Sequence, residues 1–330
     1  MNFRNKRVLV TGSEGFIGSH LVEGLLRKGA KVKAFVLYNS FNSWGWLEEL
    51  SRDNLKRIEI FLGDVRDPNS VNNAMKQIDT VFHLAALIGI PYSYVSQDAY
   101  IDTNIRGALN ILQAARRFKT NMIIHTSTSE VFGTAQYVPI DEKHPVNPQS
   151  PYAATKASAD YLALSFNKSF NLPLTIMRPF NTFGPRQSAR AVIPTIISQV
   201  LSGKSIIKLG NLETTRDFNY VANLVDAFIL LSEAKNTHGN IYNVGSGREA
   251  SIKEIVSIIG NVLGKKVRIA KDKKRIRPEK SEVKRLVCDS GALKNVCGWQ
   301  PKVTLEKGIE LTCKWFKKNL NKYKPHIYNI

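Results

Sequence analysis

The chain has 330 residues, of which 43% are hydrophobic, and its formal net charge is +20. This apolar content excludes an intrinsically disordered chain, and 3 cysteines at unrelated spacings predict neither a disulfide framework nor a metal site. No run of about 18 apolar residues is present to span a membrane. Together with the cysteine pattern, this leads us to expect a reduced, cytoplasmic protein. The basic charge fits an anionic ligand, a nucleic acid or only a lysine-rich surface.

Short apolar runs alternate with helical patterns through the first half of the chain. Strands are predicted over residues 6–10, 32–37, 57–62, 80–84, 121–125 and 174–177, with helices between them over 19–28, 70–75 and 103–118. This alternation predicts an α/β fold, a Rossmann-type doubly wound parallel sheet with right-handed crossovers. We place a dinucleotide-binding domain at residues 1–180 and a smaller mixed α/β substrate lobe at 181–330, with some elements interleaved between the two.

A glycine-rich loop, TGSEGFIG at residues 11–18, follows the first predicted strand and leads at once into a helix. Three glycines at this spacing allow a tight turn, close approach of the backbone to a pyrophosphate, and close packing of helix on strand. The helix N-terminus adds free N–H groups for the phosphates. We therefore predict a dinucleotide site that includes Gly12, Gly15, Phe16, Ile17 and Gly18.

The end of the second predicted strand lacks the residue that would select the cofactor. It reads Leu37-Tyr38-Asn39, with neither a carboxylate for a ribose 2′-hydroxyl nor an arginine for a 2′-phosphate. The choice between NAD and NADP therefore stays open at this position. Asp64, after the third strand, is either an adenine contact or a cap of the strand end.

A second motif places Tyr152 and Lys156 four residues apart, on one face of a predicted helix. The charge of Lys156 should lower the pKa of Tyr152, and an oxidised nicotinamide nearby would add to that effect. A phenolate can then take the proton of a sugar hydroxyl while hydride leaves the same carbon for the cofactor. Thr128, Ser129 and Glu130 follow the fifth strand, at the edge of the sheet where ligands bind. Alone, each pattern also fits an ordinary helix face or cap; together they indicate a catalytic site.

These three motifs together resemble the extended short-chain dehydrogenase/reductase family over essentially the whole chain. Further matching segments lie at residues 83–86, 178–186, 216–221 and 277–279. The resemblance implies a bound NAD, with NADP as the alternative. It also implies a set of cofactor-binding residues beyond the glycine loop: Asp64, Val65, Leu84, Ala85, Ala86, Asn104, Tyr152 and Lys156.

Within that family, Thr128-Ser129-Glu130 resembles the nucleotide-sugar 4,6-dehydratases. The segments 38–46 and 89–94 look like the dehydratases of the legionaminic-acid pathway, which act on nucleotide-linked N-acetylglucosamine. The resemblance implies a lyase of cell-surface glycan biosynthesis that turns a UDP- or GDP-linked hexose into a 4-keto-6-deoxy sugar. Tyr152 and Thr128 would act at the 4-hydroxyl and Glu130 would take the C5 proton. Water then leaves from C6 and hydride returns there, so the net redox change is zero.

One residue departs from part of this family. Dehydratases acting on dTDP-glucose carry aspartate at the position of Ser129, as the acid for the leaving hydroxyl. The GDP-mannose branch also has serine there, so the departure concerns the substrate, and Glu130 or a bound water would be the acid. The resemblance further implies that Arg186, Arg216 and Arg277 hold the pyrophosphate of the substrate and that Asn181 contacts its sugar or a phosphate.

Three alternative functions stay open. A UDP-glucuronate decarboxylase of the same family shares the Thr-Ser-Glu pattern, and a nucleotide-sugar 4-epimerase would not need Glu130. A non-catalytic dinucleotide-sensing protein could keep the same fold, although sensors tend to lose the catalytic pair. No motif for nucleic acid is present, so we expect most lysines to coat the surface. From the family we expect a homodimer formed through helices near residues 105–118 and 152–166.

Overall fold

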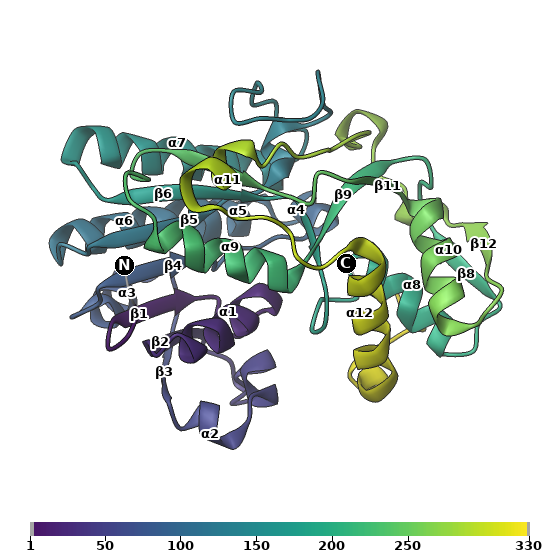
Figure 1. The fold of residues 1–330 in the computed structure, drawn as a ribbon, viewed down its shortest axis with the longest axis horizontal. Helices are drawn as coiled ribbons and strands as arrows, with labels where there is room; N and C mark the ends of the chain where they lie inside the picture. The colour runs from purple at the N-terminus through teal and green to yellow at the C-terminus, as the bar shows by residue number, and fades with distance from the viewer. Residues whose placement is uncertain (1–2, 329–330) are drawn as a thin grey trace.

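The computed structural model describes residues 3–328 and has a seven-stranded parallel sheet at its centre (Figure 1). The strand order is β10-β6-β5-β4-β1-β2-β3. The strands are β1 (Arg7–Thr11), β2 (Lys31–Leu37), β3 (Ile58–Gly63), β4 (Thr80–His83), β5 (Met122–Thr126), β6 (Leu174–Pro179) and β10 (Ile241–Val244). The predicted doubly wound α/β fold is confirmed, and the six predicted strands lie within two residues of the observed ones at each end.

The seventh strand, β10, was not predicted from the sequence. It lies far beyond the first half of the chain and pairs in parallel with β6. It is only four residues long, and it lies outside the regular alternation of strands and helices in the first half of the chain. The later part of the chain therefore completes the central sheet, while the division of the chain at residue 180 stays a prediction.

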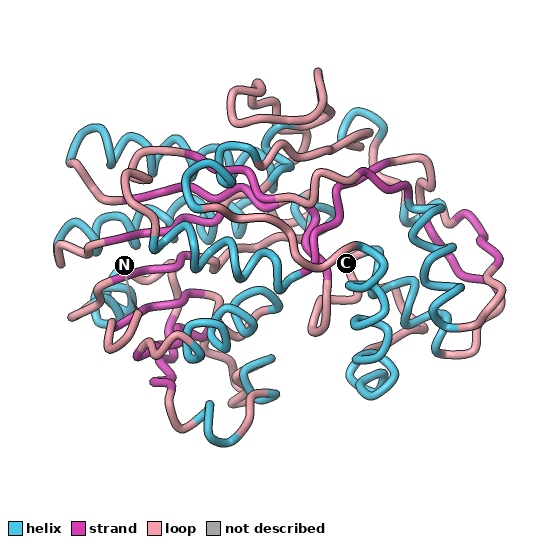
Figure 2. Tube along the Cα trace, in the orientation of Figure 1, coloured by secondary structure: helices cyan, strands magenta, loops and turns pink. Residues whose placement is uncertain are grey.

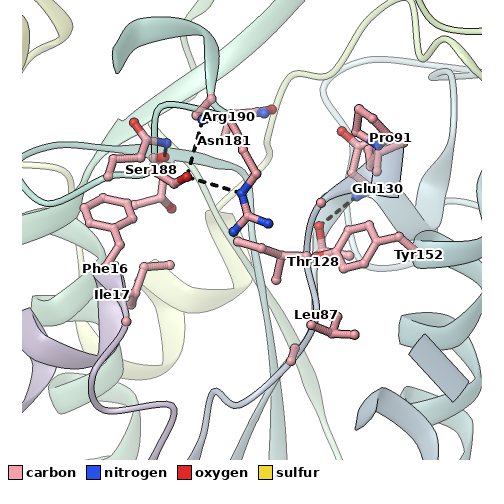
Figure 3. A pocket seen from close by; sticks show the side chains of 18 of the residues that line it. Phe16, Ile17, Leu87, Pro91, Thr128, Glu130, Tyr152, Asn181, Ser188 and Arg190 are labelled. Carbon is pink, nitrogen blue, oxygen red and sulfur yellow. Dashed lines mark hydrogen bonds between the residues drawn. The ribbon is translucent and has the colours of Figure 1, made fainter. Parts of the chain in front are cut away.

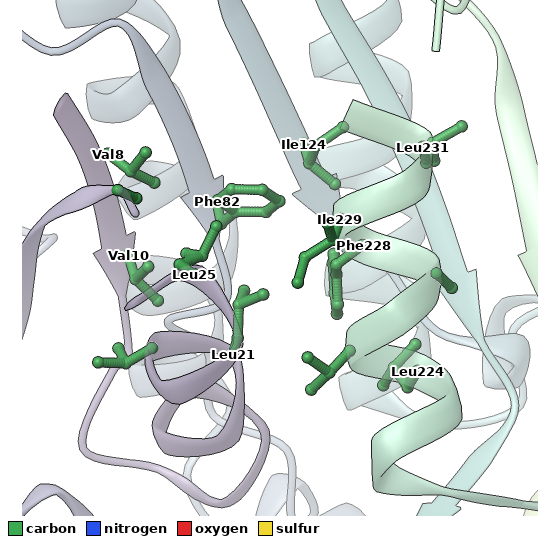
Figure 4. Close-up of a cluster of buried hydrophobic side chains, with 14 of the residues drawn as sticks. Val8, Val10, Leu21, Leu25, Phe82, Ile124, Leu224, Phe228, Ile229 and Leu231 are labelled. Atoms are coloured by element: carbon green, nitrogen blue, oxygen red, sulfur yellow. The ribbon is translucent and has the colours of Figure 1, made fainter. Parts of the chain in front are cut away.

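Alternate residues of the central strands pack against opposite faces of the sheet. On one face Val8, Val10 and Phe82 join a cluster with α1 and α9 (Figure 4), whereas Leu9 and Val81 join a cluster with α3, α6 and α7 on the other. Because successive side chains of a strand point to opposite faces, strands covered on both sides need nearly continuous apolar runs. The covering helices are α1 (Phe16–Arg27), α3 (Pro68–Met75), α6 (Gly107–Arg117), α7 (Pro151–Phe170) and α9 (Val221–Glu233).

The later residues also build a smaller lobe with an apolar core of its own. A three-stranded sheet has the order β11-β9-β7, and β8 pairs in parallel with β12. Ile196, Phe218, Ile255 and Phe316 are buried in its core. Its elements are β7 (Asn181–Phe183), β8 (Ile206–Leu209), β9 (Thr215–Tyr220), β11 (Glu249–Ser251), β12 (Arg268–Lys271), α8 (Val192–Leu201), α10 (Ile252–Leu263) and α12 (Leu305–Asn319).

Short helices connect the larger elements. One of them, η2 (Ile101–Arg106), is a π-helix that leads into α6, so the helix predicted over 103–118 begins with a wider turn. The others are α2 (Arg52–Leu55), α4 (Ile90–Ser93), α5 (Gln97–Tyr100), α11 (Gly291–Cys297), η1 (Gly45–Glu49), η3 (Ser129–Phe132), η4 (Lys273–Arg275), η5 (Glu279–Ser281) and η6 (Leu320–Lys322).

The segment 133–150, drawn as loop in Figure 2, is held in place by a late part of the chain. The N–H of Ile140 donates to the carbonyl of Val287 at 2.7 Å, and the N–H of Asp289 donates to the carbonyl of Ile140 at 2.9 Å. The hydroxyl of Ser281 donates to the carbonyl of Gln149 at 2.6 Å. These contacts hold the segment that leads into α7, and they place the residues that follow Arg277 next to that segment.

Candidate active site

A cavity of about 1320 Å³ lies at the carboxyl edge of the seven-stranded sheet. Residues at the ends of the central strands line it, among them Gly12, Leu37, Leu84 and Ser127, and Arg216 of the smaller lobe lines its other side. In such sheets ligands bind outside the carboxyl ends of the strands, where the strand order reverses. Here the order reverses between β1 and β4.

The glycine-rich loop forms one end of this cavity with all five of its predicted residues. Gly12 has φ +66°, and a Cβ there would lie 2.9 Å from the backbone nitrogen of Ala85. A Cβ on Gly18 would overlap the carbonyl oxygen of Gly12. Gly15 is the N-cap of α1, so the N–H groups of its first turn have no carbonyl partner within the helix. This backbone cradle fits a pyrophosphate.

Asp64 and Val65, after β3, line the same end of the cavity. Arg66 donates to both carboxylate oxygens of Asp64 over 2.5–3.0 Å. Burial raises the pKa of Asp64, but the hydrogen bonds and charge of Arg66 outweigh it and hold that pKa below its ordinary value. Asp64 is therefore tied to Arg66, and its contact with adenine stays a prediction.

Leu84, Ala85 and Ala86, after β4, lie on the cavity wall as expected. Thr11 orders this turn, because its Oγ1 accepts from the N–H groups of Leu84 and Ala85 at 3.1 Å each. The same hydroxyl lies 2.8 Å from Nδ1 of the buried His83. Thr11 of β1 therefore holds the turn that follows β4, and β1 and β4 are neighbouring strands in the sheet.

Asn104 lies behind the cavity wall and not on it. Its side chain accepts from the N–H of Leu87 at 2.9 Å and donates to the carbonyl of Leu87 at 3.0 Å. It also donates to Oγ1 of Thr155 at 3.0 Å. Asn104 therefore joins α7 to Leu87, which does line the cavity, and its direct contact with a cofactor stays a prediction.

The structure brings Thr128, Ser129, Glu130, Tyr152 and Lys156 together, all buried and all on the cavity wall. Thr128 is the N-cap of η3, and its Oγ1 accepts from the N–H of Glu130 at 3.2 Å. Figure 3 shows the side chains of Thr128, Glu130 and Tyr152 on the same side of the cavity. Helix α7 supplies Tyr152 and Lys156 one turn apart.

Burial dominates the electrostatics of the Tyr–Lys pair. It raises the pKa of Tyr152; the negative charge of Glu130 adds to this effect, and the hydrogen bond with Thr128 opposes it. Burial also lowers the pKa of Lys156 to about 8, although Asp160 opposes the change. For these side chains alone, burial outweighs any lowering by Lys156, so the pKa of Tyr152 lies above its ordinary value. A bound cation beside Tyr152 would favour the phenolate.

A buried polar network behind Lys156 was not predicted. The ammonium of Lys156 donates to the carbonyl of Thr126 at 2.6 Å. Asp160, one turn further along α7, accepts from Ser127 at 2.7 Å and from Arg178 at 3.0 Å. Burial nevertheless raises the pKa of Asp160. The spacing of Lys156 and Asp160, four residues apart, is the sequence signal that could have revealed the network.

Two of the predicted substrate-binding arginines meet around one carboxylate. Oε1 of Glu282 lies 3.4 Å from Nη2 of Arg216 and 3.8 Å from Nη1 of Arg277. Two guanidinium groups beside one carboxylate leave a positive charge that suits a phosphate. Asn181 lines the cavity as well, and within residues 3–328 its buried Oδ1 has no hydrogen-bond partner.

Arg186, the third of these arginines, is held at a different place on the cavity wall. Its Nη2 donates to Oε1 of Glu23 at 3.0 Å and its Nη1 to Oγ of Ser19 at 3.3 Å. Both partners belong to α1, the helix that follows the glycine-rich loop. The structure therefore groups Arg186 with the predicted cofactor end and Arg216 with Arg277 around Glu282.

Several charged residues of the cavity wall were not among the predicted site residues, and Glu14 and Arg190 are two of them. Glu14, inside the glycine-rich loop, accepts at Oε1 from the N–H of Leu37 at 3.1 Å. Arg190 precedes α8, and its guanidinium points into the cavity toward Thr128 and Tyr152 in Figure 3. Two features of the sequence could have indicated these residues. One is an acidic residue between the glycines of the loop, and the other is an arginine shortly after Arg186.

Among residues 3–328, no group of three or more His, Cys, Asp or Glu side chains could hold a metal ion. In the same range, every helix is too short or too polar to cross a membrane. The cysteines Cys288, Cys297 and Cys313 are all free.

The chain is similar to known proteins over almost its whole length. Residues 9–312 match the family described as GDP-mannose 4,6 dehydratase. A UDP-N-acetyl-α-D-glucosaminuronate decarboxylase from Bacillus cytotoxicus is 34% identical, over 94% of this chain and 98% of the relative.

Two solved structures illustrate the range of reactions among its neighbours. The dTDP-glucose 4,6-dehydratase of Bacillus anthracis in complex with NAD has a TM-score of 0.84 and 27% identity, covering 97% of this chain and 99% of that one. The UDP-glucuronic acid 4-epimerase of Bacillus cereus, in complex with UDP-glucuronic acid and NAD, has a TM-score of 0.86 and 28% identity, covering 95% and 99%.

Proposed function

Because the chain belongs to the GDP-mannose 4,6-dehydratase family, an extended short-chain dehydrogenase family of nucleotide-sugar dehydratases and epimerases, we propose that it is a nucleotide-sugar 4,6-dehydratase. The substrate we propose is a UDP- or GDP-linked hexose, N-acetylglucosamine first, and the product is its 4-keto-6-deoxy form. The observation that carries the proposal is the buried carboxylate of Glu130 beside Thr128 and Tyr152. Dehydration needs a base at C5, and 4-epimerisation does not.

We propose NAD as the cofactor, held at the glycine-rich end of the cavity. The backbone cradle of Gly12, Gly15 and Gly18 has room for a pyrophosphate, and both solved neighbours named above contain NAD. Bound there, NAD supplies a hydride acceptor for C4 and a hydride donor for C6. The wall formed by Leu84, Ala85 and Ala86 would lie along it.

Side chains of the protein itself would donate and accept the protons in this reaction. Tyr152 takes the proton of the 4-hydroxyl, and Thr128 donates a hydrogen bond to the same oxygen. The resulting ketone acidifies C5–H, and Glu130 accepts that proton, which leaves an enolate. Glu130 can pass the proton to the C6 hydroxyl, and the C5–C6 double bond forms as the C6–O bond breaks and water leaves, so Ser129 need not be an acid. When a hydride returns to C6, a proton equivalent to the one taken from the 4-hydroxyl returns to C5. Arg216 and Arg277 would hold the pyrophosphate.

One observation favours a second candidate, the decarboxylation of a nucleotide-linked uronic acid. The guanidinium of Arg190 faces the catalytic wall and has Nε bonded to Ser188 Oγ at 3.2 Å. Within the described chain its two Nη atoms make no hydrogen bond, so they are available to a substrate carboxylate. A 4-ketone promotes loss of carbon dioxide from C5 as it promotes loss of a proton.

We further propose a cytoplasmic homodimer formed through α6 and α7. Tyr161 and Phe170 of α7 are large apolar side chains left exposed, 59% and 43% respectively, which suits burial in a helical interface.

The mass of the product separates the candidates. Purified protein without added cofactor is incubated with UDP- and GDP-linked N-acetylglucosamine, UDP-glucose, GDP-mannose and UDP-glucuronic acid. We expect one of the neutral hexoses to lose one water. Loss of carbon dioxide from the uronic acid would establish the second candidate, and a product of unchanged mass but altered configuration would establish an epimerase.

A further inference from the structure

We propose that Glu14, inside the glycine-rich loop, binds the hydroxyls of the adenosine ribose and makes the protein select NAD over NADP. The inference rests on the proposed function, since it takes a dinucleotide to occupy the cavity, and it goes further by naming the residue that distinguishes the two dinucleotides. In Rossmann folds this task falls to an acidic residue at the end of the second strand. Here that position holds Leu37-Tyr38-Asn39, without an acid.

The carboxylate of Glu14 reaches the position that β2 leaves without an acid. Its Oε1 accepts from the N–H of Leu37, the last residue of β2, at 3.1 Å. Glu14 and Leu37 both line the cavity, on the same side as Asp64 after β3. An acidic group therefore stands at the carboxyl end of β2 although it comes from the loop after β1.

The Glu14 carboxylate has acceptor capacity to spare. A carboxylate can accept about four hydrogen bonds, and the N–H of Leu37 uses one of them. Within residues 3–328, Oε2 is buried and has no hydrogen-bond partner. Burial raises the pKa of Glu14, and the backbone donor at Leu37 opposes this only in part. Ribose hydroxyls would supply the missing donors.

The segment 39–46, which follows β2, fixes Glu14 in place. The N–H of Trp46 donates to the carbonyl of Glu14 at 2.9 Å. Gly45 has φ +55°, and a Cβ on it would lie 2.8 Å from the same carbonyl oxygen, so only glycine fits there. The Trp46 ring in turn packs against Trp315 and Tyr323, at 5.5 and 6.2 Å between ring centres. A distinctive aromatic loop thus anchors the acidic residue to the smaller lobe.

Among the described residues that line the cavity, two basic side chains that could meet a 2′-phosphate already have acidic partners. Arg66 already donates to both oxygens of Asp64, and Lys322 is paired with Glu49. Glu14 itself would repel a phosphate, because like charges brought together across an interface oppose binding. NAD, with a free 2′-hydroxyl, meets an acceptor instead.

The test is the change Glu14→Gln, which keeps the side-chain oxygen facing Leu37 and removes the charge. Dissociation constants for NAD and NADP are measured by calorimetry on protein freed of bound dinucleotide, and the dinucleotide that copurifies is identified by mass spectrometry. We expect the preference for NAD over NADP to narrow by about tenfold or more. Glu59→Gln is the matched control, since Glu59 is an exposed carboxylate on β3 that pairs with Lys33.

An unchanged ratio of the two constants in Glu14→Gln would overturn the inference. A second measurement needs no variant: wild-type protein should bind ADP-ribose more tightly than 2′-phospho-ADP-ribose, and equal affinities would also overturn it. If the wild-type protein binds neither dinucleotide, the proposed function fails together with the inference. If it binds NAD selectively but leaves every nucleotide sugar unchanged, only the proposed reaction fails.

Discussion

Lys156 is a charged side chain in a place that penalises charge. It is 4% exposed, and burial lowers its pKa from 10.5 to about 8. A shift of this size corresponds to roughly 3 kcal/mol of lost folding free energy when the group is charged. Its hydrogen bond to the carbonyl of Thr126 and the charge of Asp160 offset part of the penalty. The fold thus keeps an ammonium beside Tyr152 at a cost in stability.

We predict that Lys156→Met raises the free energy of unfolding at about pH 7 by roughly 1–2 kcal/mol while it abolishes turnover. Between pH of about 8 and 10.5 the unfolded chain binds more protons at Lys156 than the folded chain, so stability rises with pH in the wild type. The difference in the free energy of unfolding between Lys156→Met and the wild type should therefore shrink toward about pH 10. Urea unfolding at both pH values measures it, and Lys168→Met, an exposed lysine of the same helix, should show no such gain.

Glu130 is the residue on which the proposed elimination depends. We predict that Glu130→Gln allows oxidation at C4 but slows loss of water by about 100-fold or more, because the amide cannot accept the C5 proton. Absorbance of the reduced nicotinamide should then accumulate on the enzyme when substrate is added. Glu310→Gln, which removes an exposed carboxylate from α12, is the control and should turn over normally. Normal turnover by Glu130→Gln would remove Glu130 as the base.

At the scale of elements, the start of α7 sets the position of Tyr152. Ser150 is the N-cap, and its Oγ accepts from the N–H of Ala153 at 3.2 Å, while Pro151 occupies the first helical position. Serine followed by proline is a typical helix start, so this part of the site follows from local sequence. The helix then presents Tyr152 and Lys156 on the face that lines the cavity.

We predict that Ser150→Ala lowers the free energy of unfolding by about 1 kcal/mol, because one N–H group of the first turn loses its acceptor. Ser158→Ala on the same helix is the control: Ser158 is exposed and bonds only back to Ala154, so its replacement should be neutral or slightly stabilising. Equal effects of the two changes in chemical denaturation would show that the cap does not hold α7.

At the scale of the whole molecule, the charge of +20 acts on any anionic substrate. Lys274, Arg275, Arg277 and Lys322 line the cavity, whereas Lys317 is exposed on α12 away from it. Positively charged side chains around a cavity raise the local concentration of an anion. Salt weakens this attraction, because the screening length falls from about 10 Å at 0.1 M to about 3 Å at 1 M.

We predict that kcat/KM for the nucleotide sugar falls about threefold or more as salt rises over this range, with kcat nearly constant. Lys274→Gln should lower kcat/KM at low salt and flatten the salt dependence, while Lys317→Gln should change neither. A kcat/KM that is independent of salt would mean that the excess charge only coats the surface.

The sequence by itself determined the parts that depend on neighbours along the chain. Six strands, the glycine-rich turn and the one-turn spacing of Tyr152 and Lys156 follow from hydrophobic periodicity, backbone sterics and helix geometry, which are local. The end of the fifth strand likewise placed Thr128 and Glu130 at the carboxyl edge of the sheet. Their catalytic roles remain proposals that the experiments above address.

The tertiary structure decided what depends on groups that are distant in sequence. It added β10 to the sheet, paired Arg186 with Glu23, and raised the pKa of Tyr152, because burial and charge at a site are set by everything packed around it. It also brought the Glu14 carboxylate to Leu37, 23 residues later, and so supplied the acidic group that the end of β2 lacks. Periodicity cannot reveal such pairings, since they arise only when separate strands align in the sheet.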